Sequence, residues 1–382
     1  MSHPSVVHIV GVRPQFVKMA VVLEAAQALP EPLIVHTGQH YDPQMSQIFF
    51  DELGIPKPHH HLDSGGGNHG EQTAVMMIGI EGILAPLPPG VAVVYGDTNS
   101  TLAAALVAAK LGWQVVHVEA GLRSLDRAMP EELNRIVVDH MSRHLLCPTR
   151  RAMAQLEKEG LGSRATFTGD VMFDASLRAL EKSVLRPVGA YLSGRSDQQP
   201  DALKSIPAEV LKSGNFAVAT LHRAANTDSP TRLRRILKTL SMLPWPVLLP
   251  LHPRTRSAMK RDGLTAAGNL LLLEPVGYLD FAALIAHSRH VFTDSGGVQK
   301  EAIFHGRLCT TMRDTTEWPE TLTGDWNVLV DADPRAIRSA ATRHASTAKA
   351  PMDAFGNGRA GLLVNQVIQD ALRAIQATDS QS

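Results

Sequence analysis

The sequence predicts an α/β protein built from two domains. Short aliphatic and β-branched runs, such as residues 6–10 and 91–95, alternate with stretches of helical periodicity along most of the chain. Apolar runs of this kind are typical of parallel strands that are buried on both faces. The chain has 382 residues, more than one hydrophobic core usually serves, which favours two domains over one.

Composition excludes several classes of function. Lys plus Arg and Asp plus Glu both number 37, so the formal charge is zero and a nucleic-acid binder dominated by phosphate contacts is not expected. Cys147 and Cys309 are the only cysteines, and they form neither a disulfide framework nor a metal-type spacing. Neither a charged-then-apolar leader nor an apolar run near the ~20 residues of a spanning helix occurs. We expect a cytoplasmic protein without a membrane partner.

The expected elements follow the alternation in order. A polar segment at 193–200 precedes a second βα series, and we place the domain boundary near residue 175. Residues 59–61, three histidines in a row, are expected to form a loop and not a metal site, because sequence neighbours point in different directions. The strands are expected at 6–10, 33–37, 91–95, 115–118, 145–147, 166–168, 216–220, 246–250, 270–273 and 291–293; the helices at 16–29, 45–53, 70–84, 102–111, 130–143, 150–159 and 230–240.

Carboxylates follow two of the predicted strands and open a helix in the first half. Asp97 and Glu119 lie at strand ends, and Glu131 lies in the first turn of the helix that Pro130 opens. Open α/β sheets bind ligands at the carboxyl ends of their strands, so these side chains are candidate site residues. The alternatives are that Asp97 caps a helix and that Glu131 only favours the helix dipole.

Candidate anion-binding residues occur in both halves. Arg13 and Lys18 lie at the first strand–turn–helix, where backbone N–H groups and a helix N-terminus favour an anion, although either side chain also fits a surface position. The turn lacks GxGxxG, so a dinucleotide fingerprint is absent. In the second half Ser295, Gly296 and Gly297 precede a helix and let backbone amides approach a diphosphate, with Glu301 one turn later; an ordinary N-cap and a solvated glutamate are the alternative. Basic side chains follow other strands of that half: His222, His252, Arg254 and Arg313.

Taken together, these residues resemble the non-hydrolysing UDP-N-acetylglucosamine 2-epimerase family. The matching motifs span most of the chain in the family's order: GVRPQ (11–15), GQH (38–40), GDT (96–98), HVEAGLR (117–123), PEELNR (130–135), LHR (221–223), TDSGGVQKE (293–301) and MRDTTE (312–317). The resemblance implies two Rossmann-like domains that face each other across a cleft, as in GT-B proteins. The implied domains are residues 1–174 and 175–357, with a final helix at about 358–382 returning to the first.

The resemblance also implies the chemistry. Family members expel UDP from C1 of the sugar and remove the C2 proton, giving a 2-acetamidoglucal to which UDP adds back; the expected reaction interconverts UDP-GlcNAc and UDP-ManNAc. Asp97, Glu119 and Glu131 are the implied acid/base and charge-stabilising group, and His222 would hold or protonate the diphosphate. The implied substrate-binding residues are Arg13, Lys18, Arg135, His252, Arg254, Val276, Ser295, Gly296, Gly297, Glu301 and Arg313. No metal or nicotinamide is implied, and a homodimer is common in the family.

Departures from the commoner motifs keep the substrate open. Val12, Gln15, Ala225, Lys300 and Trp318 replace residues that are more frequent in the family. The variants resemble a branch that includes 2-epimerases for UDP-2,3-diacetamido-2,3-dideoxyglucuronate. A GT-B glycosyltransferase, and a nucleotide-sugar sensor without turnover, are the other functions that the same motifs allow.

Overall fold

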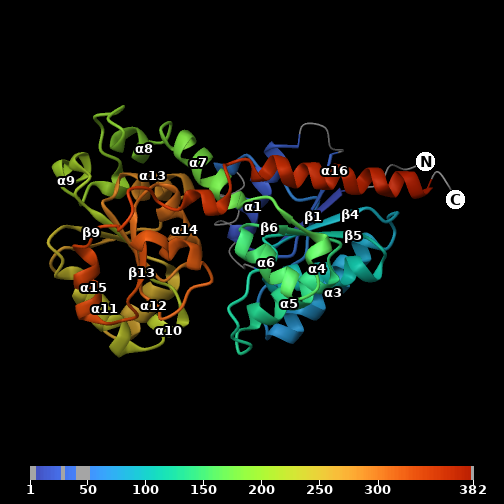
Figure 1. Ribbon diagram of the computed structural model, residues 1–382. Helices are drawn as coiled ribbons and strands as arrows, with labels where there is room; N and C mark the ends of the chain where they lie inside the picture. The colour runs from blue at the N-terminus through green and yellow to red at the C-terminus, as the bar shows by residue number, and fades with distance from the viewer. Residues whose placement is uncertain (1–5, 27–30, 40–51, 380–382) are drawn as a thin grey trace. The chain divides into compact units, whose positions relative to one another are not determined.

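Two compact α/β units make up the chain. The computed structural model describes residues 6–26, 31–39 and 52–379. One unit comprises Met1–Ala175 and Asp353–Ser382, and the other comprises Ser176–Met352. Each contains one parallel sheet with helices on both faces, which confirms the α/β class with two Rossmann-like domains (Figure 1).

The sheet of the first unit has the order β3-β2-β1-β4-β5-β6-β7 among the described residues, and its strand pairs are parallel. β1 and β4 are buried along their whole length, as continuous Val-rich runs predict. The strands are β1 Val6–Val10, β2 Leu33–His36, β3 His60–His61, β4 Val91–Tyr95, β5 Gln114–Val118, β6 His144–Cys147 and β7 Ala165–Phe167.

Helices cover both faces of this sheet. On one face Met76 and Ile80 of α3 pack with alanines of α4 and with Val138 of α5 against β1 and β4, and α1 and α16 cover the other face (Figure 1). The helices are α1 Arg13–Glu24, α3 His69–Leu84, α4 Asn99–Lys110, α5 Pro130–Met141, α6 Arg150–Lys158 and α16 Ala360–Asp379; α7 Val171–Ser183 contains the boundary between the units.

The C-terminal helix α16 packs on α1. A Cβ at Gly361 would lie 2.8 Å from Val21 Cγ1, so glycine allows the two helices to approach closely. Asn365 Nδ2 donates to Val22 O at 2.7 Å, and Asp174 accepts the N–H groups of Ala360 and Gly361 at the start of α16. These contacts join the last helix to the first unit.

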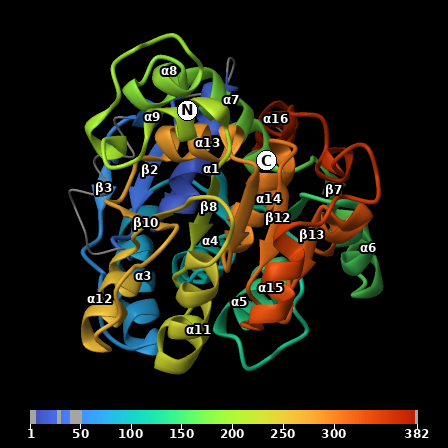
Figure 2. The ribbon, with the colours of Figure 1, turned by 90° about the vertical axis from the view of Figure 1, so that its left-hand side faces the viewer.

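The second unit repeats the architecture. Its sheet has the order β10-β9-β8-β11-β12-β13 among the described residues, and Figure 2 shows β10, β8, β12 and β13 in this sequence across the unit. The strands are β8 Ala217–Thr220, β9 Val247–Pro250, β10 Leu270–Leu273, β11 His290–Thr293, β12 Leu308–Thr311 and β13 Asn327–Leu329. The helices are α8 Pro187–Leu192, α9 Ala208–Ser213, α10 Ala224–Thr227, α11 Pro230–Ser241, α12 Pro253–Arg261, α13 Tyr278–His287, α14 Gly296–Phe304 and α15 Pro334–Ala341.

Three local expectations need comment. The expected loop at 59–61 was wrong for two residues, since His60 and His61 pair with Val35 and His36 as a short edge strand. The first helix begins at Arg13, three residues earlier than expected, because Pro14 has a backbone φ suited to the first turn. His40 and most of the expected helix at 45–53 lie outside the described residues.

In the part of the chain that the structure describes, no helix is both long enough and apolar enough to cross a membrane.

Candidate active site

Strand order identifies where each unit should bind a ligand. In an open parallel sheet the crevice lies at the carboxyl edge where the strand order reverses. In the first unit the order reverses between β1 and β4, and in the second between β8 and β11. The loops that follow these strands carry Arg13, Asp97, His222 and Ser295.

Lys18 of α1 and Glu119, directly after β5, form a buried ion pair; their side chains are 8% and 9% exposed. Glu119 has a φ of 75°, in the left-handed region, where a non-glycine residue costs about 1 kcal/mol or more. Gly96 leaves room for the pair, because a Cβ there would lie 3.3 Å from Lys18 Nζ and 3.5 Å from Glu119 Oε2. The ammonium group therefore compensates a carboxylate that the backbone holds at the end of β5.

Asp97 pairs with a guanidinium group and does not cap a helix. Arg135 of α5 donates from Nε and Nη2 to Asp97 Oδ2 at 2.9 and 2.6 Å. The N-cap of α4 is Thr98, whose hydroxyl accepts from Thr101 N. Asn134 Nδ2 also donates to the carbonyl of Asp97, at 2.9 Å. Two residues of α5 thus fix the loop after β4.

The two glutamates at the start of α5 differ in environment. Glu132 is buried and accepts the N–H groups of Ser124 and Leu125, each at 2.9 Å, as well as Arg135. Burial by itself raises the pKa of Glu132, but the hydrogen bonds of Ser124, Arg135 and Leu125 outweigh it and lower the pKa. Glu131 is only half-buried and forms no hydrogen bond or ion pair with the described residues. Its carboxylate is open to a ligand.

The side chain of Gln15 holds the turn at Arg13 through hydrogen bonds to the backbone. Gln15 Oε1 accepts the N–H groups of Gly11 and Val12 at 2.7 and 3.2 Å, and Nε2 donates to Tyr95 O at 2.7 Å. The side chain joins the loop after β1 to the end of β4. The sequence marked Gln15 only as a departure from a motif.

In the second unit the organising residue is Asp294, which follows β11. This fully buried carboxylate accepts the N–H groups of His222 at 3.1 Å and Arg223 at 3.0 Å, and Asn226 Nδ2 at 3.1 Å. It therefore holds the loop after β8 in place. Sequence reasoning missed this role, although Asp294 occupies the same kind of strand-end position as Asp97 and Glu119.

His222 lies in a cationic environment. Its ring is 5.3 Å from the ring of His252. Burial lowers the pKa of His222, and the charges of Arg223, Arg254 and Arg313 lower it further against the opposing effect of Asp294. A neutral imidazole among guanidinium groups is suited to receive an anion as a hydrogen-bond partner.

Two of these arginines have carboxylate partners. Arg254 donates from Nη2 to both oxygens of Asp228, at 2.9 and 2.8 Å, in an exposed pair. Arg313 binds Glu317 through two bonds of 2.9 and 2.7 Å, and this pair is buried. Burial by itself raises the pKa of Glu317, but the hydrogen bond and charge of Arg313 lower it to about 2.

The start of α14 has the form expected of a diphosphate cradle. Ser295 is the N-cap residue, without a side-chain capping bond. A Cβ at Gly296 would lie 3.3 Å from Trp318 Nε1, whereas a Cβ at Gly297 would meet only Ser295 Oγ, at 3.9 Å. Glu301 is buried, not solvated. The start of α14 thus leaves open space beside Gly297, whereas Gly296 is buried against Trp318.

Val276 lies beside a different helix start. It is half-buried, packs on the core formed by β8, β9 and α13, and immediately precedes Gly277, the N-cap of α13. The predicted site residues of the second unit therefore follow β8, β9, β10, β11 and β12.

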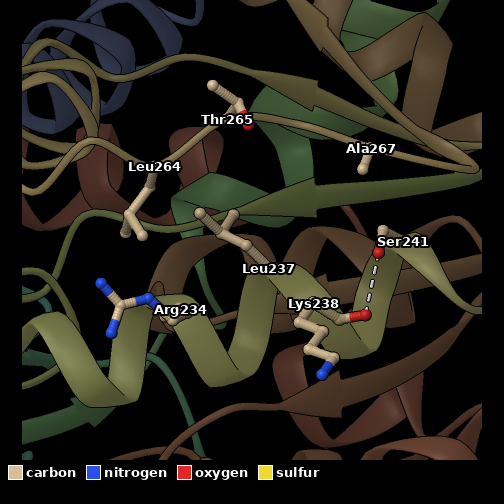
Figure 3. A pocket seen from close by; sticks show the side chains of 7 residues that line it. All are labelled: Arg234, Leu237, Lys238, Ser241, Leu264, Thr265 and Ala267. Atoms are coloured by element: carbon tan, nitrogen blue, oxygen red, sulfur yellow. Dashed lines mark hydrogen bonds between the residues drawn. The ribbon is translucent and has the colours of Figure 1, made fainter.

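A small hollow in the second unit lies apart from these strand ends. Side chains of α11 and of the segment before β10 line it, and Ser241 donates to Lys238 O at 2.9 Å (Figure 3). None of the predicted site residues is among those that line it: Arg234, Leu237, Lys238, Ser241, Leu264, Thr265 and Ala267.

We expect the Arg313–Glu317 pair to make the stability of the protein pH-dependent. Glu317→Gln should lower the free energy of unfolding by about 2 kcal/mol at pH 7, because a carboxylate with a lowered pKa stabilises the fold only while it is ionised. The deficit should shrink as the pH falls from about 4.5 toward 2. Urea denaturation across this range measures it. Glu274→Gln, which breaks the exposed pair with Arg256, is the control and should cost under ~1 kcal/mol. Equal, pH-independent losses in both variants would contradict the assignment.

Comparison with known proteins identifies the family. The model of the UDP-N-acetylglucosamine 2-epimerase family matches residues 24–369. A UDP-2,3-diacetamido-2,3-dideoxy-D-glucuronate 2-epimerase of Pseudomonas aeruginosa is 45% identical over 362 residues, covering 92% of this chain and 96% of its own. A UDP-N-acetylglucosamine 2-epimerase of Methanocaldococcus jannaschii is 36% identical over 370 residues, covering 94% of this chain and 97% of its own.

Solved structures give the same result. The crystal structure of the Methanocaldococcus jannaschii UDP-GlcNAc 2-epimerase in complex with UDP-GlcNAc and UDP superposes with a TM-score of 0.83 at 36% identity, covering 96% of this chain and 99% of its own. The chain therefore belongs to the UDP-N-acetylglucosamine 2-epimerase family, with its GT-B-like pair of domains, and is an isomerase that acts as a UDP-sugar 2-epimerase.

Proposed function

We propose that this epimerase eliminates UDP from C1 of its substrate and adds it back. The C2 proton has no adjacent carbonyl and is not acidic, so direct abstraction would be very costly. When the C1–O bond breaks, its electrons go to UDP; the C2–H electrons form a C1=C2 double bond, and the proton goes to an enzyme group. Re-addition of UDP with protonation of C2 from the opposite face gives the epimer.

The observation that carries this proposal is the division of charge between the units. The first unit presents Asp97, Glu119 and Glu131 at strand and helix ends, and the second presents guanidinium groups around His222. Carboxylates serve acid/base work and stabilise an oxocarbenium-like C1, whereas cations stabilise a departing diphosphate. Arg13, Lys18 and Arg135 bind the sugar end of the substrate. Lys18 and Arg135 also position the carboxylates with which they pair, Glu119 and Asp97.

The nucleotide is assigned to the second unit. His222, His252, Arg254 and Arg313 contact the diphosphate together with the backbone at Ser295, Gly296 and Gly297. Glu301 accepts the ribose hydroxyls, and the backbone near Val276 meets the uracil. Glu301 is a buried carboxylate in α14, one turn after Gly297, and this placement supports its part.

The sugar is proposed to be UDP-2,3-diacetamido-2,3-dideoxyglucuronate, with UDP-GlcNAc as the alternative. The relative with that named substrate is 45% identical, against 36% for the UDP-GlcNAc epimerase of Methanocaldococcus jannaschii. Lys300 and Trp318, which depart from the commoner motifs, form one unit beside Gly296: Lys300 Nζ is 3.5 Å from the centre of the Trp318 ring. The two departures are therefore coupled, as expected of a branch-specific feature.

Substrate choice is directly measurable. We expect kcat/KM for the diacetamido uronate to exceed that for UDP-GlcNAc by at least ~10-fold, since a site built for extra polar groups rejects a substrate that lacks them. NMR of the purified enzyme with each UDP-sugar measures both rates. Equal or reversed rates would assign the chain to UDP-GlcNAc.

The mechanism predicts exchange at C2. In deuterated water we expect deuterium at C2 of both epimers, because the C2 proton equilibrates with solvent.

Asp97→Asn, Glu119→Gln and Glu131→Gln should each reduce the rate by ~100-fold or more while the fold persists. Glu209→Gln, on the exposed side of α9, is the control and should leave the rate unchanged. Turnover without deuterium would indicate a glycosyltransferase or hydrolase, and full activity in all three variants would overturn the carboxylate assignment.

We propose further that the enzyme is a homodimer that associates through α3 and α5. These helices flank α4 (Figures 1 and 2). Each exposes apolar side chains: Val75 and Ile78 on α3, and Leu133, Val137 and Met141 on α5. The last three follow an i, i+4, i+8 spacing and form one line along the helix. Apolar side chains exposed on two helices that pack on the same helix, α4, support an interface there.

Ile78→Asp tests this assembly, since Ile78 is 71% exposed and its replacement should not disturb the core. A charge in the interface should convert the dimer to a monomer in analytical ultracentrifugation. Leu185→Asp, at a position in the second unit that is 83% exposed, is the control and should remain dimeric. A parent protein that sediments as a monomer would refute the proposal.

A further inference from the structure

A chain of buried charges lies beneath the carboxylates of the first unit. Glu159, the C-cap of α6, binds Arg123 through bonds of 2.9 and 2.7 Å, and Arg123 Nη1 lies 2.7 Å from Asp139 Oδ2. Asp139 of α5 then meets His117 of β5, with 2.7 Å between Oδ1 and Nδ1. The side chains of His117 and Asp139 are 1% and 0% exposed. Neither residue has a role in the mechanism above.

Both ring nitrogens of His117 face acceptors. Nδ1 meets the Asp139 carboxylate, and Nε2 lies 2.7 Å from the carbonyl oxygen of Gly96, which can only accept. A neutral imidazole has one N–H and satisfies only one such partner, whereas an imidazolium donates to both.

Asp139 is ionised in this setting. Its carboxylate accepts the N–H of Gly121 at 3.1 Å in addition to its contacts with His117 and Arg123. Burial by itself raises the pKa of Asp139, but the hydrogen bonds and charges of His117 and Arg123 outweigh it and lower the pKa. Cys147 of β6 also lies near Asp139 and stays a neutral thiol, because burial and this carboxylate raise its pKa to about 12. Arg123 contacts Oδ2 of Asp139, whereas His117 contacts Oδ1.

We propose that His117 is a buried imidazolium and acts as a positioning residue for both Asp97 and Glu119. Its Nε2 fixes the carbonyl of Gly96, the residue before Asp97. Its partner Asp139 fixes the N–H of Gly121, two residues after Glu119. Gly96 and Glu119 both have positive φ, 64° and 75°, so neighbouring contacts must hold the two loops in these conformations. The catalytic consequence rests on the proposed function; the charge of His117 does not.

Nitrogen NMR tests the charge directly. In protein labelled with ¹⁵N-histidine, the spectrum at pH 8 should contain a side chain with both nitrogens protonated. That signal should disappear in His117→Gln, and it should change in Asp139→Asn, which assigns it even if the first variant folds poorly. A neutral tautomer at His117 would overturn the proposal, whatever the enzyme's reaction.

Kinetics tests the positioning role. His117→Gln and Asp139→Asn should lower kcat by ~100-fold or more, since small displacements of catalytic groups cost about this much, while the Kd for UDP, which the second unit binds, stays within ~2-fold. His144→Gln is the matched control: His144 lies in neighbouring β6, and its side chain bonds Gln114 Oε1, at 3.0 Å, outside the His117 network, so kcat should not change. Unchanged kcat in folded His117→Gln and Asp139→Asn proteins, or an equal loss of kcat and UDP affinity, would reject the role. If His117 is protonated but the enzyme does not exchange the C2 proton, the proposed function is rejected and the charge assignment of His117 stands.

Discussion

The ion pair between Lys18 and Glu119 is the interaction on which the candidate site of the first unit depends. Removing a carboxylate from water costs several kcal/mol unless a cation and hydrogen bonds replace the solvent. Glu119 also has a left-handed backbone, which side-chain packing alone does not favour. Lys18 compensates the charge, and glycine at position 96 leaves space for both groups. The same loop edge could not hold an unpaired glutamate without changing its protonation state.

In the second unit the candidate site contains guanidinium groups around His222. In the proposed mechanism this unit presents positive charge to a leaving group whose negative charge grows as the C1–O bond breaks. Asp294 sits beneath this region and binds backbone N–H groups, so it orders the loop while leaving the guanidinium groups around His222 available. Arg254 and Arg313 are each held by a carboxylate, Asp228 and Glu317 respectively. Fixed cations of this kind require little reorganisation during the reaction.

Sequence patterns predicted the strand ends well and the partners poorly. Alternating apolar runs located most strands, and the rule that ligands bind at carboxyl edges selected Asp97, Glu119, His222 and Ser295. The rule says nothing about which distant side chain completes a pair. The side chain of Glu132 accepts two backbone N–H groups, whereas that of adjacent Glu131 accepts none. A shift of one position along the helix therefore separates a structural carboxylate from a candidate site residue. The strands β3, β12 and β13 were not predicted; they have two to four residues, and runs this short carry little periodicity.

Positional isotope exchange tests the central claim, that UDP leaves and returns. A UDP-sugar labelled with ¹⁸O in the oxygen between C1 and the β-phosphorus is incubated with the enzyme, and ³¹P NMR follows the label. If the C1–O bond breaks, the β-phosphate of bound UDP rotates, and ¹⁸O should appear at non-bridging positions on the timescale of epimerisation. Epimer that forms with all ¹⁸O still in the bridge would show that this bond never breaks and would contradict the account.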